Sequence, residues 1–334
     1  MIVSDTAPAE ALGEALAELG DVPVRLVAGG HPVELLEGAD LLCLSGGVAL
    51  DQPFVEEARR RGIRLTNDSQ VFLEAYPAPV AGVTDSTGKT TTVTLVGRMA
   101  ASAAGAGRSA WVGGNIGRPL LNDLGKIQPQ DLVVMELSSF QLELMTVSPQ
   151  VAAVLNLTPN HLDRHGTMET YSAAKARVLE FQTPDGVAVL GRDDPGAWAL
   201  RERVRGRRLA FGERLGEGDD GATLRGDSVM LRLGGQEQLV LPVGEVALPG
   251  RHNLLNVLGA VAIAAGMGIP VEAMANGIRG FAGVPHRLEL VREVDGVAWY
   301  NDSIATSPER AVAAMRSFDR PLIVLGGSRD KNLP

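Results

Sequence analysis

The segment Gly82-Val-Thr-Asp-Ser-Thr-Gly-Lys-Thr-Thr-Thr92 decides the fold. The apolar stretch 78–83 before it is typical of a buried strand, and apolar residues recur at helical spacing after it. Strand, glycine-containing loop, lysine, threonine and helix in this order are typical of a phosphate-binding loop. We therefore predict that amide groups at the helix start, Lys89 and the hydroxyl of Thr90 hold nucleotide phosphates and Mg²⁺.

Two residues of this segment depart from the general pattern. The motif G-x-x-x-x-G-K-[ST] has glycine where this chain has Val83. Asp85 also puts an acid inside a loop that is meant to hold anions. An ordinary strand-to-helix turn therefore remains the alternative on this motif alone.

Composition bounds the class of protein. A chain of 334 residues fits two or three domains, and 45% hydrophobic with 21% charged residues is typical of a globular protein. The net charge of −9 argues against a nucleic-acid surface. The single cysteine, Cys43, lies in an apolar run, so we predict a buried, inert thiol and a reducing cytoplasmic location. No apolar run approaches the ~20 residues of a membrane span, and we find no signal peptide.

The order of predicted elements divides the chain into three regions. Residues 1–70 alternate strand and helix as in a doubly wound parallel sheet, although the first strand resembles the second strand of such a unit. Residues 71–283 hold the phosphate loop, further strands and a hairpin-rich part over 207–248. Residues 284–334 open a third unit that includes a predicted strand over 321–325. We expect both ends of the chain to be short of a complete fold.

Polar residues after two further strands are candidate ligands. Glu136 ends the predicted strand 132–135, where open α/β sheets bind ligands, and a solvated strand-end glutamate is the alternative. His161, Asp163 and His165 follow another strand. Their close spacing and the lack of thiols disfavour a structural zinc site, whereas a histidine that completes a carboxylate Mg²⁺ site remains open.

Two helices carry further candidates. Composition alone predicts that Lys175 is a surface lysine on an alanine-rich helix. Asn253 and Asn256 share one face near a helix start, and helix capping by Asn253 is the alternative to ligand binding.

The ordered set of motifs resembles the Mur ligases of peptidoglycan synthesis. The matching segments run along essentially the whole chain and comprise Gly88–Thr91, Asn115 within 113–117, Glu136–Ser139, Asn160–Asp163, Ala174–Lys175, His252–Asn256, Pro285–Arg287, Tyr300–Glu309 and Leu325–Lys331. Many motifs in the right order are more specific than the phosphate loop alone.

The resemblance implies a three-domain enzyme. Residues 1–70 would form a Rossmann-like UDP-binding domain, 71–283 a central ATP-binding domain, and 284–334 the beginning of a Rossmann-like D-glutamate-binding domain. The implied activity is ATP-dependent amide formation, which adds D-glutamate to UDP-N-acetylmuramoyl-L-alanine through an acyl phosphate. A cytoplasmic monomer that binds small molecules, and neither nucleic acid nor membrane, is expected.

The resemblance also implies roles for single residues. Lys89, Lys175 and His161 would be catalytic, with Lys175 carbamylated so that it becomes a metal ligand. Two Mg²⁺ ions are expected, one at Thr90 and the second at Glu136 and His161, with the Lys175 carbamate as a further Mg²⁺ ligand. ATP would contact Ser86, Thr87, Gly88, Lys89, Thr90, Thr91, Asn253, Asn256, Arg287 and Asp302. The other substrates would contact Asp5 and Thr6 (uridine), Asn115 and Ser138 (muramoyl group), and Thr306 and Lys331 (D-glutamate).

Departures from the family pattern lead to two expectations and keep two alternatives open. The family usually has glycine in place of Asp85, whose repulsion of a phosphate at ~4 Å approaches ~4 kcal/mol, so we predict weakened ATP binding. Because the third region is short, we also expect this chain alone to form little amide product. A folylpolyglutamate-synthase-like ligase is one alternative, against which residues 1–70 argue. A non-catalytic nucleotide- or UDP-sugar-binding protein is the other.

Overall fold

The computed structural model describes residues 1–76, 79–105, 107–117, 119–305, 308–318 and 320–327. The chain divides into two compact units, Met1–Asp68 and Ser69–Pro334.

The first unit is built from two pairs of parallel strands. β1 (Ile2–Asp5) pairs with β2 (Arg25–Ala28), and β3 (Leu41–Cys43) pairs with β4 (Arg64–Thr66). Short helices connect them: η1 (Ala9–Leu12), α1 (Gly13–Glu18), η2 (Val33–Leu36) and α2 (Pro53–Arg60). The predicted alternation of strand and helix is confirmed. The side chain of Cys43 is exposed, so the prediction of a buried thiol is wrong.

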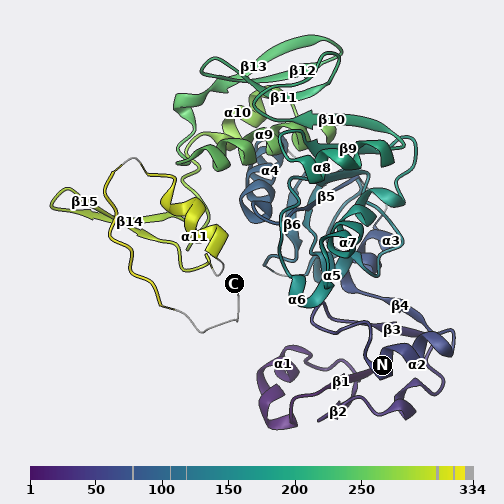
Figure 1. Ribbon diagram of the computed structural model, residues 1–334. Coiled ribbons are helices and arrows are strands. Elements are labelled where there is room, and N and C mark those ends of the chain that lie inside the picture. Colours follow the sequence, from purple (N-terminus) through teal and green to yellow (C-terminus); the bar gives the residue numbers. More distant parts are fainter. Residues whose placement is uncertain (77–78, 106, 118, 306–307, 319, 328–334) are drawn as a thin grey trace. The chain divides into compact units, whose positions relative to one another are not determined.

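The second unit is organised on one sheet of nine strands in the order β13-β12-β11-β10-β9-β8-β5-β7-β6 (Figure 1). Their bounds are β5 (Val80–Thr84), β6 (Ala110–Gly114), β7 (Leu132–Glu136), β8 (Val151–Val154), β9 (Val187–Gly191), β10 (Arg207–Phe211), β11 (Gly221–Arg225), β12 (Ser228–Leu233) and β13 (Gln236–Pro242). Neighbours from β6 to β11 are parallel, and β11, β12 and β13 pair antiparallel. The predicted hairpin-rich part therefore extends the parallel sheet.

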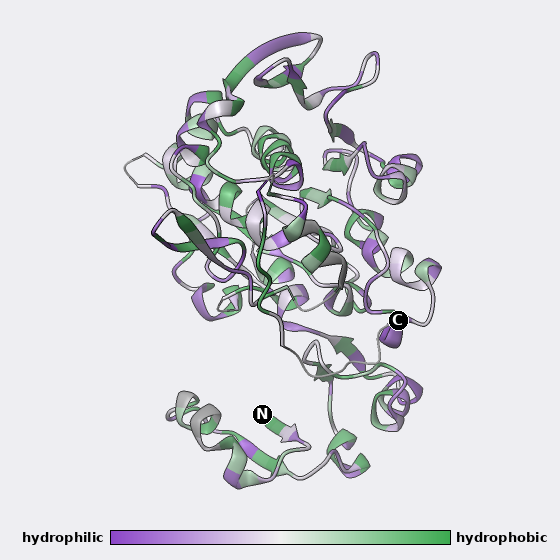
Figure 2. Ribbon diagram, turned by 60° about the vertical axis from the view of Figure 1, so that its left-hand side comes forward, coloured by the Kyte–Doolittle hydropathy of each residue, from purple (hydrophilic) through white to green (hydrophobic). Residues whose placement is uncertain are grey.

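Alternating side chains of the central strands build two apolar layers, one on each face of the sheet. Figure 2 colours the ribbon by hydropathy, and hydrophobic residues are frequent in the central strands and helices. Val134 points into one layer with residues of α4 (Lys89–Ala103), α9 (Arg251–Gly266) and α10 (Val271–Ile278). Val133 and Met135 point into the other, with residues of α3 (Asp68–Ala75), α5 (Ser139–Leu142), α7 (Met168–Glu180) and α8 (Pro195–Ala199). Since both faces are covered, the strands are apolar throughout, as parallel sheets require.

The strand order places a switch point at β5. The chain goes from β5 to β6 and β7 on one side and then to β8 on the other, so connections diverge at the carboxyl end of β5. Open α/β sheets bind ligands in the crevice at such a point. The remaining short elements of this region are η3 (Leu120–Asp123), α6 (Leu162–His165), η4 (Leu200–Arg203) and η5 (Val243–Glu245).

The last part of the chain forms a hairpin and a helix. β14 (Glu289–Val294) pairs antiparallel with β15 (Val297–Asn301), and α11 (Pro308–Met315) follows. The prediction of a strand over 321–325 is wrong, because the described residues 320–327 form no strand and leave Ile323 and Leu325 exposed. A parallel strand needs a neighbour for its backbone groups, and none of the described strands pairs with this segment.

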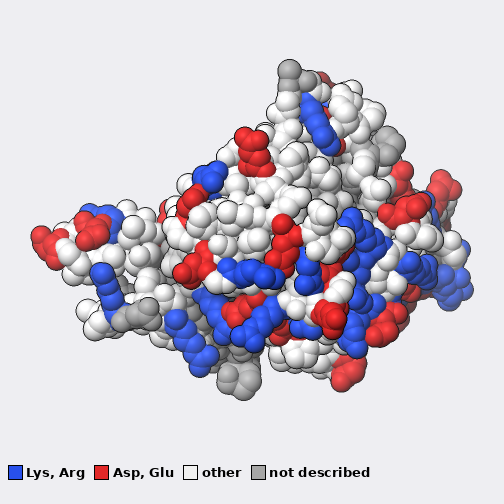
Figure 3. Space-filling view, turned by 90° about the horizontal axis from the view of Figure 1, so that it is seen from above, with Lys and Arg blue, Asp and Glu red and all other residues white. Residues whose placement is uncertain are grey.

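Charged side chains of both signs are interspersed on the face shown in Figure 3. Over residues 207–242 they form ion pairs such as Arg225 with Glu237 and Arg208 with Asp219. Within the described part of the chain, no helix combines the length and apolar character that crossing a membrane requires.

Candidate active site

The phosphate loop lies between the end of β5 at Thr84 and the start of α4 at Lys89. Gly88 caps the helix with φ +113°, and a Cβ atom there would lie 2.4 Å from Oδ1 of Asn256. Both the backbone conformation and the close approach require glycine at this position. The first amide groups of α4 have no partner within the helix and face the loop, as in sites that bind phosphate.

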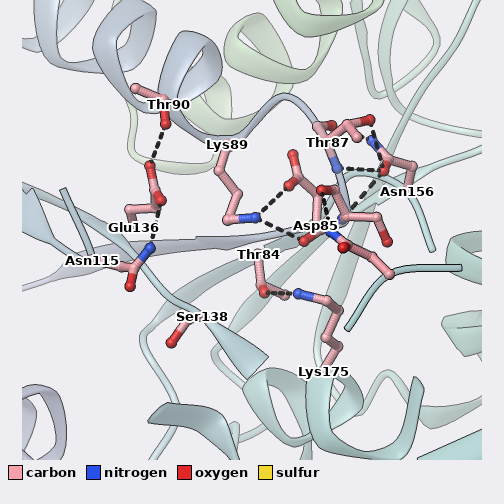
Figure 4. Close-up of polar contacts among 12 residues, drawn as sticks. Thr84, Asp85, Thr87, Lys89, Thr90, Asn115, Glu136, Ser138, Asn156 and Lys175 are labelled. Atoms are coloured by element: carbon pink, nitrogen blue, oxygen red, sulfur yellow. Dashed lines mark hydrogen bonds and ion pairs between the residues drawn. The ribbon is translucent and has the colours of Figure 1, made fainter. Parts of the chain in front are cut away.

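Asp85 and Lys89 form an ion pair inside this loop (Figure 4). Nζ of Lys89 donates to Oδ1 of Asp85 at 2.8 Å and to the Asp85 carbonyl oxygen at 2.9 Å. Asp85 is fully buried, and its Oδ2 has no hydrogen-bond partner in the described structure. The loop therefore carries its own anion beside the lysine that would bind phosphate.

Glu136 ends β7 next to the helix start. Its carboxylate accepts hydrogen bonds from the Thr90 hydroxyl at 2.9 Å and from Nδ2 of Asn115 at 3.0 Å (Figure 4). Only 3% of Glu136 is exposed, so the alternative of a solvated strand-end glutamate is wrong. The end of β6 approaches closely, because a Cβ atom at Gly114 would lie 2.3 Å from the Glu136 carbonyl oxygen.

Lys175 is buried on α7, and the prediction of a surface lysine is wrong. Its Nζ donates to the Thr84 hydroxyl at 3.1 Å and lies 4.9 Å from the ring centroid of Tyr171. Burial and, next, the positive charge of Lys89 hold the Lys175 pKa well below its usual range, against the opposing charges of Asp85 and Glu136. The surroundings therefore shift the protonation equilibrium of Lys175 toward the neutral amine.

The two histidines of the 161–165 segment have different surroundings. His161 caps α6 with φ +53°, and its ring meets Phe140 edge-on at 5.2 Å. His165 is buried, stacks on Phe140 and has Nε2 2.9 Å from the Ser139 hydroxyl. No group of three His, Cys, Asp or Glu side chains in the described ranges is arranged to hold a metal.

A cavity of about 400 Å³ brings most of the predicted residues together. The predicted residues that line it are Ser86, Thr87, Gly88, Lys89, Thr90, Asn115, Glu136, Ser138, His161, Lys175 and Arg287. Phe140, Asn160 and Tyr171 also line it and were not predicted. Ser138 additionally caps α5, where its hydroxyl accepts from the Gln141 amide at 3.2 Å.

A second cavity of about 450 Å³ shares Thr87, Gly88, Arg287 and Ile304 with the first. Of the other predicted residues, Asn256 and Asp302 line it. Sequence reasoning missed further lining residues: Leu155, Asn156, Asp193, Asp194, Phe211 and His252. Asn156 stands two residues after the end of the buried strand β8, which is a signal that could have identified it.

Some predicted residues lie outside both cavities. Asn253 is buried and donates from Nδ2 to the Pro249 carbonyl at 2.7 Å. Because Gly250 is the cap of α9, the alternative of Asn253 as helix cap is wrong. Thr91 is buried in α4, and its hydroxyl has no hydrogen-bond partner among the described residues.

Two predicted substrate residues belong to the first unit. Oδ1 of Asp5 accepts from the amide of Ala7 at 2.7 Å, and Thr6 is exposed. Near them, the Ser4 hydroxyl lies 2.8 Å from Nδ1 of His31, a contact that sequence reasoning missed. The predicted D-glutamate contacts, Thr306 and Lys331, lie outside the described residues.

The sheet, the loop and the cavity define a class of protein: an α/β protein with a phosphate-binding loop at its switch point. The Mur ligase middle domain matches residues 83–264. Over 331 residues the chain is 45% identical to the UDP-N-acetylmuramoylalanine–D-glutamate ligase of Symbiobacterium thermophilum, covering 99% of this chain and 72% of that protein. The corresponding ligase of Pelotomaculum thermopropionicum is 43% identical over 317 residues, with 95% and 69% covered.

The chain belongs to the Mur ligase family. Solved structures agree at the level of the fold. MurF from Acinetobacter baumannii matches with a TM-score of 0.57 at 24% identity, covering 74% of this chain and 55% of that chain. A murein peptide ligase from Psychrobacter arcticus matches with a TM-score of 0.56 at 18% identity, covering 94% and 70%.

Proposed function

We propose that this chain is an ATP-dependent ligase of peptidoglycan precursor synthesis that joins D-glutamate to UDP-N-acetylmuramoyl-L-alanine. The names of its relatives support the two substrates. The observation that carries the proposal is the convergence of Lys89, Thr90, Glu136, His161 and Lys175 on one cavity.

The chemistry explains why these groups converge. The muramoyl substrate's carboxylate attacks the γ-phosphoryl group of ATP, which gives an acyl phosphate and ADP. The amine of D-glutamate then attacks the acyl carbon, forms the amide and releases phosphate and a proton. The first step brings two anions together, so the ammonium of Lys89 and the helix start of α4 stabilise the developing charge. The buried walls of the cavity keep water from the acyl phosphate.

The donor set fits magnesium. A buried carboxylate of Glu136 lies in hydrogen-bond contact with the Thr90 hydroxyl, and Mg²⁺ prefers such oxygen ligands. Thr90, Glu136 and His161 would hold the ions, which when bound neutralise charge on the phosphoryl oxygens. The two-ion arrangement is part of the proposal.

We also propose that Lys175 is carbamylated. Its lowered pKa shifts the protonation equilibrium toward the neutral amine, which adds to the carbon of CO₂ and loses one proton to give an anionic carbamate. The carbamate would add oxygen ligands beside Glu136. The burial of Lys175 and the contact of its Nζ with the Thr84 hydroxyl support this assignment.

The remaining parts of the proposal concern organisation. We propose that 1–70 bind the uridine end of the substrate through Asp5 and Thr6, that 71–283 bind ATP, and that 284–334 begin the D-glutamate-binding region with Thr306 and Lys331. We further propose a cytoplasmic monomer.

The test is incubation with ATP, Mg²⁺, UDP-N-acetylmuramoyl-L-alanine and D-glutamate, with mass detection of products. Parallel reactions replace D-glutamate with hydroxylamine, which converts an acyl phosphate into a hydroxamate. Amide product supports the whole proposal, and hydroxamate without amide supports phosphoryl transfer only. Absence of both products contradicts the proposed function.

The ion pair between Asp85 and Lys89 favours a second candidate, a UDP-sugar-binding protein without catalysis. Thermal unfolding distinguishes the two. Stabilisation by UDP-N-acetylmuramoyl-L-alanine but not by ATP·Mg²⁺ favours the binding protein, because a ligand raises the unfolding temperature only if the folded state binds it.

A further inference from the structure

Asn156 binds the phosphate loop from the neighbouring strand. It lies just beyond β8, and its Oδ1 accepts from the amide of Thr87 at 3.0 Å and from the amide of Ser86 at 3.3 Å. Its Nδ2 donates to the Thr87 carbonyl oxygen at 2.6 Å (Figure 4). The carboxamide therefore pairs with Thr87 through both an acceptor and a donor.

The same segment makes further bonds to Ser86. The Ser86 hydroxyl donates to the Thr158 carbonyl at 2.8 Å and accepts from the Thr158 amide at 3.0 Å. Nδ2 of Asn160 donates to the Ser86 carbonyl at 3.3 Å. Because His161 directly follows Asn160, these bonds connect the phosphate loop to the segment that carries the proposed metal ligand.

The amide groups of the loop are thus divided between two partners. The Asn156 side chain satisfies the amide of Thr87 and shares that of Ser86 with its own backbone carbonyl, which accepts at 3.1 Å. The first amides of α4 have no helical partner and remain for phosphate oxygens. Thr87 and Gly88 line both cavities, so their position shapes the wall between them. A loop that is fixed before binding loses less entropy when ATP arrives.

We propose that Asn156 is a positioning residue that holds the phosphate loop in its ATP-binding shape and fixes the spacing between Lys89 and His161. This assignment rests on the proposed function. It extends that function by naming a residue that acts through Thr87 and Ser86 and contacts neither phosphate nor metal.

The test compares Asn156→Ala with Gln182→Ala. Gln182 is a matched control, because its buried amide donates three hydrogen bonds, to the carbonyls of Pro149, Gln150 and Val187, at the opposite ends of the strands. Thermal unfolding and calorimetric titration with ATP·Mg²⁺, without the sugar nucleotide, are measured for both. Asn156→Asp is the second variant, since it keeps the acceptor for both amides and loses the donor to Thr87.

Asn156→Ala and Gln182→Ala both lower the unfolding temperature. Of these two, only Asn156→Ala raises the ATP dissociation constant, by roughly tenfold or more for the lost hydrogen bonds. Asn156→Asp stays folded and also binds ATP more weakly, because it loses the donor to the Thr87 carbonyl oxygen and its carboxylate repels that oxygen. If Asn156→Ala and Asn156→Asp bind ATP within twofold of the unmodified chain, or if Gln182→Ala weakens binding equally, the assignment is wrong. If the unmodified chain binds no ATP, the proposed function and this assignment both fall. If it binds ATP but forms neither hydroxamate nor amide, the proposed function alone falls.

Discussion

Removing the negative charge of Asp85 tests whether this carboxylate competes with nucleotide phosphates for Lys89. In Asp85→Asn the side chain keeps its size and position but no longer pairs with the Lys89 ammonium, which is now 2.8 Å away. Lys89 is then available to nucleotide phosphates, and the repulsion between the carboxylate and those phosphates disappears. We therefore expect tighter ATP binding and a less stable nucleotide-free protein.

The burial of the Asp85–Lys89 pair determines how much ATP affinity and stability should change in Asp85→Asn. The Asp85 side chain is 0% exposed and that of Lys89 is 15% exposed, so the pair lies between a surface ion pair, worth about 0–1 kcal/mol, and a fully buried one, whose disruption costs about 3–5 kcal/mol. An intermediate value of about 1–3 kcal/mol corresponds to a ~5- to 150-fold lower ATP dissociation constant. The free energy of unfolding without ligand should fall by a similar amount, because Lys89 loses its ion-pair partner and keeps only the Asp85 carbonyl oxygen.

Calorimetric titration with ATP·Mg²⁺ and denaturant unfolding measure the two effects separately. Asp219→Asn is the control, because it removes a carboxylate that pairs with Arg192 and Arg208 and lines neither cavity. It should lower stability without changing ATP affinity. Equal or weaker ATP binding by Asp85→Asn would refute the reasoning, and Asp85→Gly should move ATP binding in the same direction as Asp85→Asn.

Four further changes have defined outcomes. Glu136→Gln should remove the Mg²⁺-dependent part of the ATP affinity measured by calorimetry. The free energy of unfolding should change by only about 1 kcal/mol, because a glutamine oxygen still accepts from Thr90 or Asn115. Labelled ¹³C-bicarbonate should give a carbamate carbon signal by NMR that Lys175→Met lacks; identical spectra would contradict the carbamate. Gly114→Ala should lower the free energy of unfolding in urea by about 2–4 kcal/mol, because φ at this position is +95° and the new Cβ would meet the Glu136 carbonyl oxygen. Gly117→Ala is the control, with φ +64° and no described atom within 4 Å, and should lower it by about 1 kcal/mol. Burial raises the pKa of Asp131, but hydrogen bonds from Gln128, Ser109 and Trp111 and the charge of Arg108 outweigh burial and lower that pKa. The stabilisation that the Asp131 carboxylate gives is therefore present above the unfolded pKa of ~3.9 and is lost as the pH falls through the folded pKa. Asp131→Asn should flatten this part of the acid unfolding curve.

Local sequence was sufficient for the phosphate loop and for Glu136. Strand, loop and helix follow one another within the quoted segment, so the order of these elements can be predicted from neighbouring residues. Glu136 was found because the carboxyl ends of parallel strands share one edge of the sheet.

Long-range packing decided what the sequence did not reveal. An alanine-rich helix gives no indication of which face docks, so the burial of Lys175 against Thr84 could not be predicted. Asn156 reaches Thr87 across 69 positions of sequence. The exposed Cys43 shows that an apolar run alone does not establish burial, because its neighbours Leu42 and Leu44 are less exposed than the thiol residue itself.

Oxygen transfer tests the central claim, that the cavity brings the substrate carboxylate to the γ-phosphoryl group of ATP. UDP-N-acetylmuramoyl-L-alanine labelled with ¹⁸O in its carboxylate is incubated with ATP and Mg²⁺, with D-glutamate or hydroxylamine as nucleophile. We predict that the released phosphate carries one ¹⁸O atom from the carboxylate. Phosphate that takes its oxygen from water instead would contradict the account.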